Sequence, residues 1–245
     1  VLNRVLRWTD KGIEYEAGPR HVEIILKQLN IDQCKLVPTP GTKEEGTLKS
    51  GDAHPEGTGL LDEQRSYAFR ALVARANYLA PDRPDIAFAV KELARAMSKP
   101  DEGDWCRLKR LARYLQGRRR LVKMFRWQEW PTALSIFTDA DWAGDKKTRK
   151  STSGGCIMIG THAIKAWSKS QSLIALSSGE SELYATLKAS AEGLGLQFIC
   201  KDLNLHMRGG VWGDASAALG IINRRGLGKT RHIDIGLLWV QQVAA

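Results

Sequence analysis

Short apolar runs and helically spaced apolar residues alternate along the second half of this chain. Residues 134–138 are mostly apolar or β-branched, which is typical of a strand buried on at least one face. Similar runs predict three further strands, at residues 156–160, 164–167 and 210–213. Helical spacing predicts three helices, at residues 178–202, 215–223 and about 230–242. In the first of these helices, the residues expected to be buried are Leu183, Leu187, Leu194 and Phe198. The pattern therefore predicts an α/β domain over residues 131–245.

The first half of the chain has a mainly helical pattern. Residues 1–8 and 12–16 predict a hairpin whose turn lies at residues 9–12. Four helices are predicted, at residues 19–29, 67–79, 85–97 and 102–116. Residues 38–65 are rich in Gly, Thr, Glu, Lys, Pro and Asp, a composition that buries too little apolar surface to order itself. We therefore expect a flexible linker there, followed by a helical segment over residues 66–130.

Carboxylates at the ends of predicted strands are candidate ligands of a functional site. A buried aspartate costs desolvation energy unless it meets a cation, a hydrogen-bond donor or water. Taken alone, Asp139 after the strand at 134–138 is typical of a turn, and Asp214 is typical of a helix cap. A third acidic residue, Glu182, lies in the first turn of the long predicted helix. Carboxylates that converge from three such elements are the ligands expected of a two-metal Mg²⁺ site.

Two glutamates compete for the middle position of this set. Residues 177–180 have the sequence of a capping box, in which Glu180 folds back onto the N-terminus of its own helix. Glu182 then stays free to face the strand that ends at Asp139. We assign the position to Glu182, and this choice rests on the capping motif alone.

The composition favours a polyanionic partner. Lys and Arg number 37 against 27 for Asp and Glu, a formal charge of +10, although many basic proteins bind no nucleic acid. Two basic clusters, on the predicted helix at 102–116 and in the loop after Asp139, are candidate phosphate contacts. Their basic and hydroxyl-bearing residues are Arg107, Lys109, Arg110, Arg113, Lys146, Lys147, Arg149, Lys150, Ser151 and Thr152. A solvated helix face is the alternative interpretation of the first cluster.

Three classes of protein are disfavoured by the sequence: membrane-spanning proteins, zinc modules and disulfide frameworks. No apolar run is long enough to span a membrane. The four cysteines are scattered, which argues against a zinc module and a disulfide framework and fits a reducing compartment.

Several motifs carry a family resemblance. The most specific blocks are residues 138–145 (TDADWAGD), 148–155 (TRKSTSGG), 175–182 (ALSSGESE) and 229–234 (KTRHID). These blocks closely resemble the ribonuclease H region of copia-type retrotransposon Pol polyproteins. Residues 83–90 and 108–115 look like the connecting segment ahead of that region. Residues 1–37 resemble the tail of the reverse transcriptase of the same polyprotein.

The resemblance implies a ribonuclease H-like fold, a mixed five-stranded sheet with flanking helices, preceded by a mainly helical connection segment. It implies Asp139, Glu182 and Asp214 as ligands of two Mg²⁺ ions, with Mn²⁺ as a substitute, and hydrolysis of RNA in an RNA–DNA hybrid. The implied partner is the reverse transcriptase portion of the same polyprotein. The implied location is intracellular, in a cytoplasmic particle or the nucleus, without secretion. His232 is a candidate auxiliary residue near the scissile phosphate, although a histidine at a helix N-terminus is more often structural.

Two departures from the family pattern matter. The chain has no Asp-Asp pair, so it lacks the polymerase's metal-binding motif. The family also draws a fourth carboxylate from a later Ala-Asp segment, whereas this chain stops at Ala245. Since the chain also begins at Val1 without a leader, we expect a C-terminally truncated piece of a longer protein. The alternative function is a catalytically inactive ribonuclease H-like module that binds nucleic acid, or a fragment of a decayed retroelement.

Overall fold

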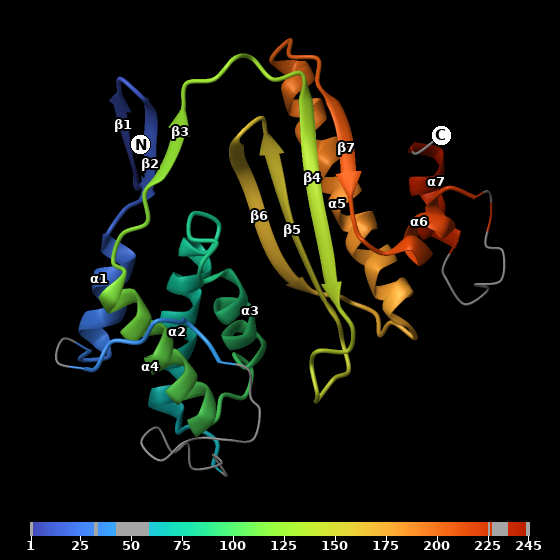
Figure 1. The fold of residues 1–245 in the computed structure, drawn as a ribbon. Coiled ribbons are helices and arrows are strands. Elements are labelled where there is room, and N and C mark those ends of the chain that lie inside the picture. Colours follow the sequence, from blue (N-terminus) through green and yellow to red (C-terminus); the bar gives the residue numbers. More distant parts are fainter. Residues whose placement is uncertain (1, 32–33, 43–58, 225, 227–234, 244–245) are drawn as a thin grey trace. The chain divides into compact units, whose positions relative to one another are not determined.

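The computed structural model of the protein describes residues 2–31, 34–42, 59–224, 226 and 235–243. The chain divides into two compact units, Val1–Trp127 and Gln128–Ala245, whose helices and strands are labelled in Figure 1. The predicted hairpin and the helices after it belong to the first unit, and the α/β elements belong to the second. None of the helices in the described part of the chain has the length and apolar character needed to cross a membrane.

In its described residues, the first unit combines a three-stranded sheet with four helices. Its antiparallel strands, in the order β1-β2-β3, are β1 (Arg4–Thr9), β2 (Gly12–Ala17) and β3 (Lys123–Arg126). The hairpin of β1 and β2 confirms the prediction. The strand β3 was not predicted, because its sequence Lys-Met-Phe-Arg lacks a strand pattern and it forms by pairing with the distant β2.

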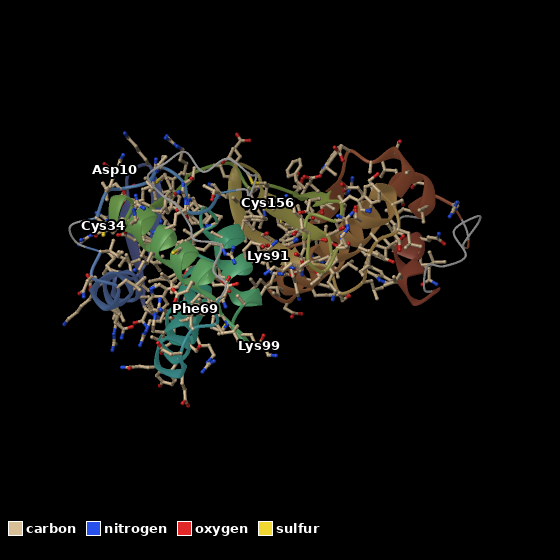
Figure 2. All side chains as sticks on the ribbon, turned by 90° about the horizontal axis from the view of Figure 1, so that it is seen from below. Asp10, Cys34, Phe69, Lys91, Lys99 and Cys156 are labelled. Atoms are coloured by element: carbon tan, nitrogen blue, oxygen red, sulfur yellow. The ribbon has the colours of Figure 1, made fainter. Side chains whose placement is uncertain are left out.

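The helices of the first unit are α1 (Arg20–Gln28), α2 (Glu63–Leu79), α3 (Ala87–Arg95) and α4 (Glu102–Gly117). They share a hydrophobic core that includes the fully buried Phe69, labelled in Figure 2. The helix α2 begins before its predicted start because Asp62 caps it, accepting a hydrogen bond from the Arg65 backbone N–H at 2.8 Å. The end of the predicted linker is therefore structured, and Leu61 is buried. Residues 43–58, most of the predicted linker, lie outside the described residues.

The second unit contains a mixed four-stranded sheet in the order β6-β5-β4-β7. Its strands are β4 (Ala133–Asp141), β5 (Thr152–Ile159), β6 (His162–Ser170) and β7 (Arg208–Trp212). The strand β4 runs antiparallel to β5 and parallel to β7. The predicted mixed α/β class is confirmed. The fifth strand that the family resemblance implies has no counterpart among the described residues.

The double glycine at 154 and 155 lies in a strand, although the strand was predicted to begin only at residue 156. The strand β5 begins at Thr152, and Gly154 pairs with Asp139 of β4. The ring of Trp167 on β6 packs against Gly155, where any side chain would collide with it. Glycines normally weaken a strand, but here Gly155 makes room for this ring.

The long helix α5 (Ser178–Asp202) lies along one face of the sheet (Figure 1), and its bounds match the prediction. Leu134, Ile136 and Ile157 of the sheet pack with Ala189 of the helix. Gly193 brings the helix backbone against the Ile136 side chain. This contact fixes the helix beside β4, the strand that carries Asp139.

The other helices of the second unit are α6 (Ser216–Ile222), η1 (Ile235–Trp239) and α7 (Val240–Val243). Leu183 and Leu187 of α5 are buried against residues of these short helices, as predicted, and Leu194 is half-buried. The prediction was wrong for Phe198, which is 63% exposed. The buried face of α5 runs to Cys200, and this leaves Phe198 on the solvent side. The first residues of the last predicted helix, 230–234, lie outside the described residues.

Candidate metal centre

Three carboxylates from three different elements meet at one edge of the second unit's sheet. Asp139 lies near the end of β4, Glu182 lies near the start of α5, and Asp214 follows β7. One carboxylate oxygen from each residue lies within 4.8 Å of the other two. Asp139 and Asp214 share this edge because β4 and β7 are parallel and end on the same side. The structure therefore brings together all three residues proposed as ligands.

Glu182 is the least exposed member of this group, at 9% exposure. Its Oε1 accepts a hydrogen bond from the Ala140 backbone N–H at 3.1 Å. Burial raises the pKa of the Glu182 carboxyl, and the nearby charges of Asp139 and Asp214 raise it further, although the bond from Ala140 opposes them. The three carboxylates thus repel one another across a short distance.

Within the described residues, the charge of this group has no cationic side chain paired with it. In the part of the chain that the structure describes, none of the ion pairs involves Asp139, Glu182 or Asp214. Three clustered oxygen ligands with uncompensated charge suit a hard divalent cation such as Mg²⁺. The residues present therefore fit the metal that the family resemblance implies.

Glu180 is occupied elsewhere. Its Oε2 accepts a hydrogen bond from the Leu176 backbone N–H at 2.8 Å, and its Oε1 accepts one from the Tyr184 hydroxyl at 2.5 Å. The Ser177 hydroxyl accepts from the Glu180 backbone N–H at 3.2 Å, which caps α5. These bonds keep Glu180 at the helix entrance, while Glu182 reaches β4.

The other acidic side chains near Asp139 also have local partners. The Asp141 carboxylate accepts a hydrogen bond from the Thr152 backbone N–H, across the pair of strands β4 and β5. Asp145 accepts hydrogen bonds from the backbone N–H groups of Lys147 and Thr148, at 3.1 and 3.2 Å. Of the three aspartates between 139 and 145, Asp139 alone belongs to the carboxylate group.

The loop that joins β4 and β5 differs in one respect from its predicted use. Ser151 is completely buried, and its hydroxyl accepts a hydrogen bond from the Ala143 backbone N–H at 2.9 Å. It shapes the loop and offers no hydroxyl to a ligand, so its assignment as a nucleic-acid contact is wrong. Thr152 is half-buried within β5. The cations of the loop point outward, with Lys146, Lys147 and Arg149 exposed and Lys150 half-buried.

The basic residues of α4 lie in the other unit and mostly have partners inside it. Those partners are Asp104 for Arg107, the Thr39 hydroxyl at 2.9 Å for Arg110, and the Lys35 carbonyl oxygen at 2.6 Å for Arg113. Lys109 is exposed. The bonds of Arg110 and Arg113 hold the segment 35–39 against α4, and phosphate contact by this helix stays a prediction. The acceptors are distant in sequence from two of these arginines, so the charge pattern alone did not indicate these bonds.

One residue beside the carboxylates was not predicted. Trp142 is 54% exposed, and its indole N–H donates a hydrogen bond to the Ala175 carbonyl oxygen at 3.1 Å. The sequence signal that could have indicated this residue is a tryptophan directly after the aspartate that ends a strand. His232 lies outside the described residues.

Replacing Glu182 with Gln is expected to raise the melting temperature of the second unit in Mg²⁺-free buffer near neutral pH. A carboxyl whose pKa is raised by folding favours the folded state at low pH, and this contribution is lost as the pH rises through the folded pKa. The Gln side chain keeps an oxygen that can accept the hydrogen bond from the Ala140 N–H, and it stays uncharged as the pH rises. The advantage of the variant should therefore grow with pH in thermal denaturation between about pH 4 and about pH 8. Parallel curves for variant and parent would contradict the repulsion described above.

Sequence comparison finds relatives among transposon proteins. The chain is 35% identical over 198 residues to the Retrovirus-related Pol polyprotein from transposon RE2 of Arabidopsis thaliana, which covers 77% of the chain and 13% of that protein. It is 29% identical over 228 residues to the Retrovirus-related Pol polyprotein from transposon TNT 1-94 of Nicotiana tabacum, covering 91% of the chain and 17% of that protein. The chain thus spans a small part of the length of these relatives.

A shorter relative is covered more completely. An uncharacterized mitochondrial protein of Arabidopsis thaliana is 30% identical over 173 residues, which make up 71% of the chain and 68% of that protein. No protein-family model matches the chain. No solved structure matches it either.

Proposed function

The chain belongs to the family of retrovirus-related Pol polyproteins from copia-type transposons, and from this premise we propose that its second unit is a ribonuclease H-type endonuclease. The proposed reaction is Mg²⁺-dependent hydrolysis of the RNA strand in an RNA–DNA hybrid. The proposed setting is an intracellular one, a cytoplasmic particle or the nucleus, where the unit acts beside the reverse transcriptase portion of the same polyprotein. Residues 1–37 and 66–130 are proposed to be the tail of that reverse transcriptase and a connection segment.

The observation that carries the proposal is the group formed by Asp139, Glu182 and Asp214, whose oxygens lie within 4.8 Å of one another. These carboxylates would hold two Mg²⁺ ions, or Mn²⁺ as a substitute. Divalent cations in such a site supply Lewis-acid activation of water and stabilise the leaving oxygen of a phosphodiester. The chain's own contribution is to fix three ligands on two strand ends and one helix, with Glu182 held by the Ala140 N–H at 3.1 Å.

The loop between β4 and β5 supports nucleic acid as the substrate. It begins at the end of the strand that carries Asp139, and Lys146, Lys147 and Arg149 are exposed on it. Exposed cations of this kind contact backbone phosphates without reading sequence. Recognition of RNA in the hybrid then depends on its 2′-hydroxyls, for which exposed backbone groups near the carboxylates are the proposed donors and acceptors.

The test is a cleavage assay with the full chain on end-labelled RNA–DNA hybrid, RNA duplex and DNA duplex of one sequence, with Mg²⁺, with Mn²⁺ and with a chelator. We expect cleavage of the RNA strand in the hybrid alone, and only with a divalent cation. If the chain binds the hybrid but cleaves it under none of these conditions, the enzyme hypothesis is wrong and the inactive binding module is favoured. Equal cleavage of the DNA duplex would overturn the proposed substrate.

A further inference from the structure

Trp142 connects the two elements that carry the first two carboxylates. It directly follows β4, three residues after Asp139, and its indole N–H donates to the Ala175 carbonyl oxygen at 3.1 Å. Ala175 is buried and lies on the short segment that leads into α5. The bond therefore ties the end of β4 to the entrance of the helix that bears Glu182.

A second hydrogen bond joins the same two regions, but it uses a proposed ligand. Glu182 Oε1 accepts from the Ala140 backbone N–H at 3.1 Å. The acceptor is the side chain of a proposed ligand, so this bond depends on how Glu182 is oriented when a cation binds. The bond from Trp142 uses no ligand atom and is independent of the state of the carboxylates.

The loop behind Trp142 is itself held in place. Ala143 has a left-handed backbone with φ of 51°, and its N–H donates to the buried Ser151 hydroxyl at 2.9 Å. A non-glycine residue keeps such a backbone only when its surroundings impose it. A side chain at Gly144 would collide with the Asp141 carboxylate. The indole is thus presented from a rigid turn.

We infer that Trp142 is a positioning residue for the metal centre, an inference that rests on the proposed function. It holds the end of β4 against the entrance of α5, and it keeps Asp139 and Glu182 close although their charges repel. Ligands that are held together before a cation arrives bind it more tightly, because less order has to be created on binding. The ring of Trp142 is 54% exposed. Its hydrogen bond to Ala175 therefore explains the positioning role better than packing of the ring does.

The test compares Trp142→Phe with Trp130→Phe in the full chain, by thermal denaturation over a series of Mg²⁺ concentrations and by hybrid cleavage over the same series. Trp142→Phe keeps an aromatic ring and loses the donor. Trp130 is a matched control, since it is 69% exposed in the same unit and its indole has no hydrogen bond within the described residues. Trp142→Phe should need about threefold more Mg²⁺ to reach the same rise in melting temperature and half of the maximal cleavage rate, the effect of one modest hydrogen bond. Trp130→Phe should need the same amount as the parent.

At saturating Mg²⁺ we expect Trp142→Phe to cleave at the parent rate, because the ligands themselves are intact. The inference is overturned if Trp142→Phe and the parent have the same Mg²⁺ midpoint for cleavage. If the variant keeps that midpoint but melts at a lower temperature without Mg²⁺, Trp142 has a purely structural role. A parent chain that shows no Mg²⁺ response at all would overturn the proposed function itself. These failures are distinguishable because the parent curve is measured in the same experiment.

Discussion

Replacing Asp139 with Asn is expected to lower the rate of hybrid cleavage about a thousandfold, since a metal site contributes several kcal/mol to stabilising the transition state. The amide removes one of three anionic ligands and leaves the shape of the side chain almost unchanged. The fold should survive, because Asp139 is exposed and its backbone pairs with Gly154 of β5. Single-turnover cleavage of labelled hybrid measures the rate, and thermal denaturation with and without Mg²⁺ reports whether the cation response is lost as well.

Asp141→Asn is the matched control for this experiment. Asp141 lies two residues further along the same strand, but its carboxylate accepts a hydrogen bond from the Thr152 backbone N–H and stays outside the carboxylate group. We expect this variant to keep its rate within about tenfold of the parent. Cleavage at the parent rate by Asp139→Asn would remove the assignment. Equal losses in both variants would show that the loop, and not a ligand, had been disturbed.

The carboxylate group was predictable because each member has a signal among its sequence neighbours. Asp139 and Asp214 follow short apolar runs that form β4 and β7. The position of Glu182 follows from the capping sequence, since the bonds of Glu180 to Leu176 and Tyr184 occupy the competing glutamate. A parallel arrangement of the two strands then brings the ends together. The bounds of α5 were also predictable, because a capping sequence marks its start and apolar residues at helical spacing follow along its length.

The contacts of the arginines were not predictable, because their acceptors come from distant parts of the chain. Arg120 ends a run of three arginines, and such a run of charge is typical of a phosphate contact. Its guanidinium instead forms two hydrogen bonds with the Glu16 carboxylate of β2, at 2.8 and 2.9 Å. Local charge shows that a cation is present, and only the tertiary fold shows which anion it meets. The same reason explains β3, whose residues become a strand through pairing with β2.

Arg83 is a buried cation of the first unit whose loss should cost much stability. It is 2% exposed, and its guanidinium donates to the Asp85 carboxylate at 2.8 and 2.9 Å. It also donates to the Arg118 carbonyl oxygen at 3.0 Å, just beyond the end of α4. A cation at a helix C-terminus satisfies carbonyl groups that have no partner within the helix. One buried side chain thus connects the turn before α3 with the end of α4.

Replacing Arg83 with Ala is therefore expected to lower the free energy of unfolding of the first unit by about 3 kcal/mol at neutral pH, the usual cost of removing one partner from a buried ion pair. Asp85 would keep its hydrogen bond from the Tyr114 hydroxyl at 3.0 Å but lose its cation. Lys109→Ala on α4 is the control, since Lys109 is exposed, and its effect should stay within about 0.5 kcal/mol. Denaturant unfolding measures the loss, and amide hydrogen exchange in α4 assigns it to the first unit.

The pH dependence of this loss separates the ion pair from simple packing. Burial by itself raises the pKa of Asp85, but the hydrogen bond and charge of Arg83, together with Tyr114, lower it overall. A lowered folded pKa contributes stability above the unfolded pKa, and this contribution disappears as the pH falls through the folded value. The difference between the parent and Arg83→Ala should therefore be largest at neutral pH and shrink in acid. A difference that stays constant with pH would mean that Arg83 stabilises the unit through its packing and its bonds to α4, and that its charge adds nothing to Asp85.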